Sequence, residues 1–176
     1  MAWTPRWIFT AVLISSCGGE LDRSTTDSEA LGETEAVYAL DVSVYTRMIS
    51  WSELDCLWSA EHHFTDYSFV PDNLQLMAHL TALCPDIDLG TAAVILPWHD
   101  PLRVAENASV VDMLSKGRLR LGLGRGLARR EFAAFRLSMD ESRERFDEAA
   151  PMIVKALKTG FIEGDGPFYK IGRAHV

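Results

Sequence analysis

Glu61, His62 and His63 place a carboxyl group and two imidazoles side by side, directly after the short apolar run Leu57–Ala60. Histidine is the side chain that most readily changes charge near neutral pH, so this cluster can move protons or bind a metal ion. A histidine pair at a strand end is also common as a hydrogen-bonded structural feature. These residues alone leave both interpretations open.

The elements that must position this cluster are predicted from the apolar pattern. Short apolar runs closed by polar residues are typical of strands buried in a parallel sheet, and such runs occur at 57–60, 86–96 and 119–123. Apolar spacings of three or four predict helices with the stripes Leu74, Met77, Ala78 and Thr81; Val104, Ala105, Ala108 and Val111; and Phe146, Ala150, Ile153 and Leu157. This alternation predicts an α/β fold of parallel βαβ units, in a sheet or a barrel.

Prolines and one aspartate mark the expected helix ends. Pro71 suits a first helical position, and the helix that follows should stop before Pro85. Asp140 is a candidate N-cap for the last helix, which Pro151 should kink or begin. A further helix over 36–51 is expected to feed the opening strand.

The residues that follow the three predicted strands should share one crevice, because ligands of parallel α/β folds bind outside the carboxyl ends of the strands. Gly124 and Gly126 would let the backbone approach a ligand, and Arg125 can hold a phosphate by two parallel hydrogen bonds. Tight packing of strand into loop is the alternative reason for these glycines. Ala92 and Ala93 are small, which leaves space for a flat ring or reflects a crowded barrel centre.

A metal site is a second possible use of Glu61, His62 and His63, with His99 as a further ligand. Adjacent strand residues point to opposite faces, however, and neither HxH nor HExxH spacing occurs. His99 and Asp100 lie in a proline-bounded turn, where a polar pair is usually solvated. We therefore predict no metal.

Composition and charge narrow the class of protein. The net charge of −8 argues against nucleic acid as a partner, because no basic cluster stands out from the acidic background. Three cysteines without a CxxC pair favour reduced thiols and a cytoplasmic location over a disulfide framework or a zinc knuckle.

The amino terminus has three interpretations. Arg6, the apolar residues 7–16 and Cys17 have the outline of a lipoprotein export signal, which we rank below a cytoplasmic location. Residues 7–15 could instead form a first core strand. The third interpretation is that the amino-terminal segment, residues 1–35, is translated out of frame. The run is too short to span a bilayer, so no membrane span is predicted.

Four ordered motifs resemble the luciferase-like flavin monooxygenases, especially the bacterial luciferase α-type branch. They are Trp-Ser-Ala-Glu-His-His-Phe-Thr at 58–65, Gly-Thr-Ala-Ala-Val-Ile-Leu-Pro at 90–97, Leu-Ser-Lys-Gly-Arg at 114–118 and Gly-Leu-Gly-Arg-Gly-Leu at 122–127. A weaker match continues to about Tyr169.

The resemblance implies a (β/α)8 TIM barrel that binds reduced FMN, or a deazaflavin in some relatives, and uses oxygen to oxidise a small organic substrate such as an aldehyde. It assigns catalysis to His62 and His63. It assigns cofactor binding to Glu61, Ala92, Ala93, Gly124, Arg125, Gly126 and Arg143, with a cis peptide between the alanines and the phosphate on the arginines. A flavin reductase as electron source and a dimer of the full-length protein are also implied.

Departures from the family pattern limit what the chain is expected to do alone. A complete barrel takes about 250 residues, so this chain is expected to be an inactive first half. Gly124 stands where bacterial luciferase has a reactive cysteine, so light emission is not supported. Two functions are alternatives to a flavin-dependent monooxygenase: a metal-dependent barrel hydrolase and a non-catalytic subunit of a luciferase-like heterodimer.

The expected organisation has three parts. Residues 1–35 are an uncertain amino-terminal segment, and residues 36–170 are a partial luciferase-like barrel domain. Residues 171–176, Ile-Gly-Arg-Ala-His-Val, resemble the translation of a common sequencing adapter, so His175 is not counted among functional residues.

Overall fold

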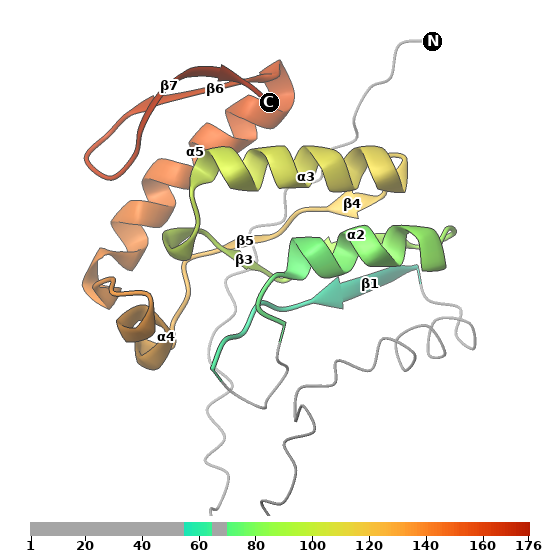
Figure 1. Ribbon diagram of the computed structural model, residues 1–176, viewed down its shortest axis with the longest axis horizontal. Helices are drawn as coiled ribbons and strands as arrows, with labels where there is room; N and C mark the ends of the chain where they lie inside the picture. Colours follow the sequence, from blue (N-terminus) through green and yellow to red (C-terminus); the bar gives the residue numbers. More distant parts are fainter. Residues whose placement is uncertain (1–54, 65–69) are drawn as a thin grey trace, which may run out of the picture.

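The computed structural model describes residues 55–64 and 70–176 (Figure 1). The predicted export signal or first strand and the helix expected over 36–51 lie outside these residues. The elements in chain order are β1 Cys56–Ser59, α2 Asn73–Leu83, β2 Asp88–Thr91, β3 Val94–Ile95, the 3₁₀ helix η1 Leu96–Trp98, α3 Pro101–Ser115, β4 Leu119–Arg120, β5 Leu123–Gly124, α4 Arg129–Ala134, the 3₁₀ helix η2 Met139–Glu141, α5 Ser142–Thr159, β6 Phe161–Asp165 and β7 Lys170–His175.

The first strands are parallel, as the alternation of strands and helices predicted. One sheet has the order β1-β2-β4, with Leu57 opposite Leu89 and Leu89 opposite Leu119, and β3 pairs with β5 beyond it. Leu89 and Leu119 are buried in the core beneath α2 and α3, which lie side by side over the strands in Figure 1. The α/β class is therefore confirmed.

The single strand expected over 86–96 is wrong in detail, because it is divided into β2 and β3. The interruption falls at Ala92–Ala93, whose peptide bond is cis. Just before it, the Thr91 hydroxyl donates to the Gly122 carbonyl at 3.0 Å and accepts from the Gly122 N–H at 2.9 Å. The Thr91 side chain thus replaces the backbone hydrogen bonds of the sheet at this point. An apolar pattern in the sequence cannot reveal such a replacement. The strand expected over 119–123 is likewise divided, into β4 and β5.

Two predicted helix starts are also wrong. Asp72 is the N-cap of α2 and accepts from the Gln75 N–H at 2.9 Å, so Pro71 lies before the cap and outside the helix. Asp140 lies within η2, which Ser138 caps, and α5 begins at Ser142. Pro151 therefore lies inside α5, on its exposed side.

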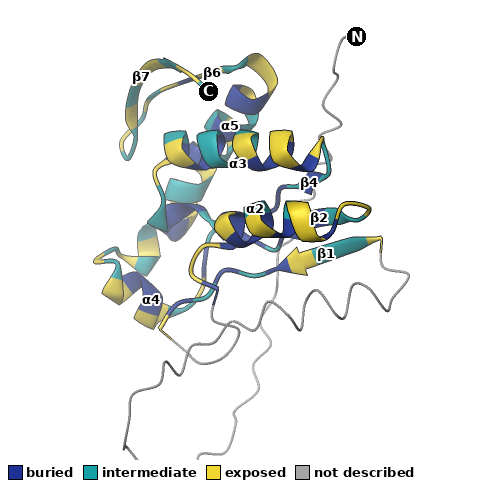
Figure 2. Ribbon diagram, turned by 45° about the vertical axis from the view of Figure 1, so that its right-hand side comes forward, coloured by how far each residue is buried: buried dark blue, intermediate teal, exposed yellow. Residues whose placement is uncertain are grey.

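The predicted apolar stripe of α3 is confirmed, since Val104, Ala105, Ala108 and Val111 are all buried. Figure 2 shows buried and exposed residues alternating along α2 and α3, as expected for helices that bury one side. Among residues 55–64 and 70–176, the longest apolar helical stretch falls short of what a membrane crossing needs.

The sequence did not predict α4 or the antiparallel hairpin of β6 and β7, which packs against α5. Six residues are too few for α4 to show a helical period. Residues 171–175 lie in β7. Their origin from an adapter stays a prediction.

Gly122 lies between β4 and β5, where its backbone packs closely against that of Thr91. A Cβ added there would lie 2.1 Å from the Thr91 carbonyl oxygen, which belongs to a neighbouring strand and cannot rotate away. We expect Gly122→Ala to lower the free energy of unfolding by at least about 2 kcal/mol, measured by urea denaturation. Gly172→Ala is the matched control, because a Cβ there meets nothing within 4 Å. Equal stability of both variants would contradict this packing.

Candidate active site

The three predicted strand ends lie next to one another. Ala92 N–H donates to the Ser59 carbonyl at 2.7 Å, which joins the end of β1 to the end of β2. Val94 N–H donates to the Gly122 carbonyl at 2.9 Å, which joins the second end to the third. A Cβ on Gly124 would lie 3.2 Å from that of Ala93. The convergence expected of a parallel α/β fold is therefore present.

Glu61 is the centre of the polar network at the first strand end. Its side chain is completely buried, and it accepts three hydrogen bonds: from His63 Nε2 at 3.0 Å and His99 Nε2 at 2.7 Å on Oε1, and from the Ile95 N–H at 2.9 Å on Oε2. Burial alone would raise the pKa of this carboxyl group, but the bonds from His63, His99 and Ile95 outweigh burial and lower it. Glu61 is thus an ionised carboxylate committed to protein partners.

The expectation that His99 is a solvated turn residue is wrong. His99 follows η1, and its ring is partly buried against Glu61 rather than simply solvated. Burial works to lower the pKa of His99, but the hydrogen bond and the charge of Glu61 prevail and raise it. Because Glu61 Oε1 only accepts, both His63 and His99 carry a proton on Nε2.

His62 and His63 have different environments. The His63 side chain is 9% exposed, and its ring lies edge-on to Trp98 and Phe135 at centroid distances of 5.2 and 4.8 Å. The His62 side chain is 37% exposed, and Nδ1 lies 3.8 Å from Glu131 Oε1. His62 is therefore the histidine of the pair that a ligand can reach.

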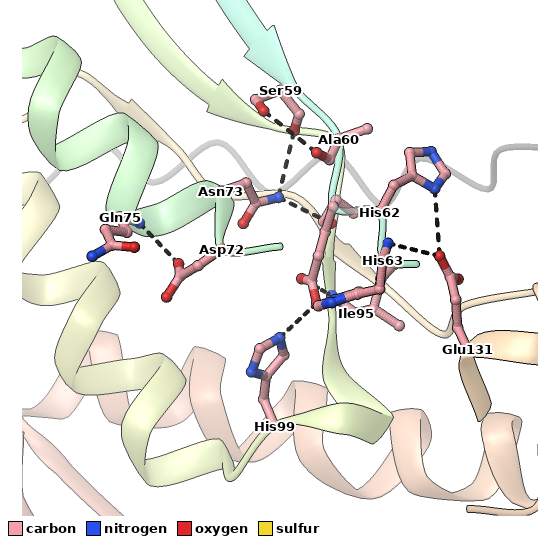
Figure 3. A network of polar contacts seen from close by, with 12 residues as sticks. Ser59, Ala60, His62, His63, Asp72, Asn73, Gln75, Ile95, His99 and Glu131 are labelled. Carbon is pink, nitrogen blue, oxygen red and sulfur yellow. Dashed lines mark hydrogen bonds and ion pairs between the residues drawn. The ribbon is translucent and has the colours of Figure 1, made fainter. Parts of the chain in front are cut away.

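Two functional candidates were missed by sequence reasoning. Buried Glu131, from α4, accepts the backbone N–H of His63 at 2.9 Å and faces His62 (Figure 3). Buried Asn73, the first residue of α2, donates through Nδ2 to the carbonyls of Ala93 at 3.1 Å and Ser59 at 3.5 Å. Each is a buried polar residue in a helix, and only its distant partners reveal what it does.

At the second strand end, Ala93 is buried and Ala92 is partly exposed. The expected cis peptide bond between them is present. The expected contact of this peptide with a flavin ring stays a prediction.

At the third strand end, Gly126 has φ +72°, and a Cβ there would lie 2.8 Å from Ile95 Cγ2 and 3.1 Å from Phe132 Cε2. Packing and backbone conformation together require this glycine. Half-buried Arg125 donates to the Ser142 hydroxyl at 3.3 Å, at the start of α5, where exposed Arg143 follows. Two predicted phosphate ligands thus lie at or beside one helix N-terminus, which favours anions.

The alternative metal site gains no support from this geometry. His63 and His99 direct their Nε2 atoms at one carboxylate oxygen of Glu61, as hydrogen-bond donors do. Residues 55–64 and 70–176 hold no group of three His, Cys, Asp or Glu arranged to bind a metal ion.

Comparison with known proteins agrees with the fold and with the family that the sequence resembles. Residues 27–176 match the family model described as luciferase-like monooxygenase. The chain therefore belongs to the luciferase-like monooxygenase family. It is 32% identical over 122 residues to the alkanal monooxygenase alpha chain of Photorhabdus luminescens, covering 69% of this chain and 34% of that protein.

Two solved structures are similar. Monooxygenase RslO1 from Streptomyces bottropensis aligns with a TM-score of 0.63 and 34% identity, over 65% of this chain and 35% of that one. The oxygenating constituent of 3,6-diketocamphane monooxygenase from Pseudomonas putida, in complex with FMN, aligns with a TM-score of 0.66 and 17% identity, over 76% of this chain and 37% of that one. The second likeness concerns the fold alone. The chain spans about a third of the length of the curated relatives it matches.

Proposed function

We propose that this chain is the first part of a flavin-dependent monooxygenase with a (β/α)8 barrel, and that its three strand ends form one side of the flavin site. One observation carries the proposal: the carboxyl ends of the neighbouring parallel strands β1 and β2 are hydrogen-bonded to each other. The first end carries the partly exposed His62, and the second carries the small residues Ala92 and Ala93. In such folds this edge is where ligands bind.

The residues present fit a flavin. Ala92 and Gly124 are each partly exposed, and their small size leaves room for a flat ring to lie close to the backbone. Arg125 and the N-terminus of α5 offer a cation and backbone N–H groups to a phosphate. The same side chains match FMN and a deazaflavin cofactor, and we propose reduced FMN as the first to test.

When bound, the reduced flavin supplies the electrons with which molecular oxygen is activated. His62 is proposed to give or take a proton through its imidazole, because that side chain is 37% exposed at the strand end. His63 and Glu61 are proposed to hold the strand end that carries His62, because both are buried and hydrogen-bonded to each other. Ala92, Ala93 and Gly124 are proposed to form the surface that contacts the flavin ring.

The substrate is proposed to be a small organic molecule such as an aldehyde, by analogy with the alkanal monooxygenase alpha chain. A separate flavin reductase, a dimer of the full-length protein and a cytoplasmic location complete the proposal. The domain limits at residues 36 and 170 stay predictions.

Arg125→Ala should weaken FMN binding by about tenfold or more, because a charge-assisted contact to phosphate is lost. The measurement is a fluorescence titration of FMN against the full-length protein. Riboflavin, which has the same ring without the phosphate, should bind wild type and variant alike. Arg130→Ala, which removes an exposed arginine of α4, is the matched control. An unchanged FMN affinity in Arg125→Ala would remove Arg125 from the phosphate site.

A further inference from the structure

His99 is placed to act on the first strand end from another part of the chain. It lies between η1 and α3, 38 residues beyond Glu61, and its Nε2–Oε1 distance of 2.7 Å is shorter than the 3.0 Å from His63. Its side chain is 31% exposed, whereas that of Glu61 is 0% exposed. Figure 3 shows the His99 ring directed from the start of α3 toward the network. His99 therefore connects a buried carboxylate to solvent.

A buried carboxylate needs a compensating positive charge, because an isolated ion inside a protein is strongly unfavourable. Within the part of the chain that the structure describes, the basic side chains hydrogen-bonded to Glu61 are those of His63 and His99. The His63 ring is enclosed by the rings of Phe64, Trp98 and Phe135 and is 9% exposed. His99 borders a small cavity of about 30 Å³, and its side chain is partly exposed, so it can exchange protons with water.

The charged groups around His99 come from two helices as well as from Glu61. Asp72, the N-cap of α2, adds a second negative charge, and Asp100 and Arg103 lie at the start of α3. Asp72 and Arg103 line the same cavity. The nearest and most buried of these charges is that of Glu61, so Glu61 decides the charge state of the ring.

We propose that protonated His99 is a positioning residue for the first strand end: its charge keeps Glu61 ionised, and Glu61 then holds the His63 ring and the Ile95 N–H in place. The backbone that carries His62 is fixed as a result. The inference rests on the proposed function only in taking His62 as the reacting group.

The directions of the two pKa changes agree with such a pair, since the pKa of Glu61 is lowered and that of His99 is raised. The raised pKa of His99 means that its contribution to stability is complete below the unfolded pKa of about 6.5 and is lost as the pH rises through the folded value. The lowered pKa of Glu61 means that its contribution is complete above about 4.5 and is lost on acidification. The pair should thus contribute most between these two values.

The first test is an NMR titration of the chain labelled with ¹⁵N-histidine, with the His99 signal assigned from His99→Gln. In wild type, His99 should keep its proton above the ordinary histidine range. In Glu61→Gln its midpoint should fall by about one pH unit or more, because the charge is removed while an acceptor oxygen remains. Glu163→Gln, which removes an exposed carboxylate of β6 that pairs with Lys155, should leave the midpoint unchanged. Equal midpoints in wild type and Glu61→Gln would overturn the proposal.

His99→Gln gives a second test that remains available if Glu61→Gln does not fold. Glutamine can donate a hydrogen bond but cannot carry the charge. The loss of unfolding free energy as pH rises above about 6.5 should be present in wild type and smaller in His99→Gln. The same pH dependence in both proteins would overturn the proposal. Neither test contains flavin, so a failure of flavin binding would count against the proposed function and leave these outcomes unaffected.

Discussion

Replacing Glu61 by alanine is expected to lower the free energy of unfolding by about 3–5 kcal/mol, because it leaves buried donors without their acceptor. The Glu61 side chain is fully buried and accepts from His63, His99 and the Ile95 N–H. Its removal orphans all three groups and leaves His99 without its neutralising charge. Urea denaturation of the chain at about pH 6 measures the loss, since the pair contributes fully there.

Glu163→Ala is the matched control for that loss. Glu163 also forms an ion pair, with Lys155 at 2.7 Å, but it lies on the exposed face of β6. Its removal should leave the unfolding free energy unchanged within error, because solvent screens exposed pairs. A Glu61→Ala protein as stable as Glu163→Ala would show that the buried network does not hold the strand ends together.

His62→Ala is expected to cut turnover of the full-length protein by about a hundredfold or more at saturating flavin. The side chain is partly exposed at the strand end, and its imidazole is the group proposed to transfer the proton. The measurement is substrate-dependent oxygen consumption with reduced FMN supplied, alongside flavin affinity.

Because His62 is not at the centre of the Glu61 network, His62→Ala should unfold in urea close to wild type. His79→Ala, an exposed histidine of α2, should keep full turnover and controls for loss of a surface imidazole. Full turnover by His62→Ala at matched flavin occupancy would contradict the catalytic assignment.

Local patterns were enough to predict the parts of the fold that repeat along the chain. The apolar runs that contain Leu57, Leu89 and Leu119 form parallel strands in register, and the stripe from Val104 to Val111 is the buried side of α3. Both signals arise from burial of one face of a regular element, so they are visible in a single sequence. The closeness of the three strand ends could be predicted from these elements, because the carboxyl ends of parallel strands meet at one edge of the sheet.

The polar contacts that assemble the site could not be predicted in the same way. Glu61 meets His99 across 38 residues, and the His63 N–H meets Glu131 across 68. Such pairs depend on how α3 and α4 are placed by the whole fold. The local cluster of Glu61 with His62 and His63 is visible in the sequence, whereas the hydrogen bonds of Glu61 with Ile95 and His99, 34 and 38 residues away, are not.

The same reason explains the errors at element ends. The Thr91 hydroxyl replaces ladder hydrogen bonds at Gly122, and Asp72 rather than Pro71 defines the start of α2. Each boundary is decided by a side-chain to backbone hydrogen bond, which apolar periodicity does not detect.

A crystal structure of the full-length protein with FMN tests the central claim most directly. We expect the flavin ring to lie against Ala92 and Ala93 on the side where His62 is exposed, with the phosphate within hydrogen-bond distance of Arg125. FMN bound elsewhere, or a saturated crystal in which these strand ends stay empty, would contradict the proposed flavin site.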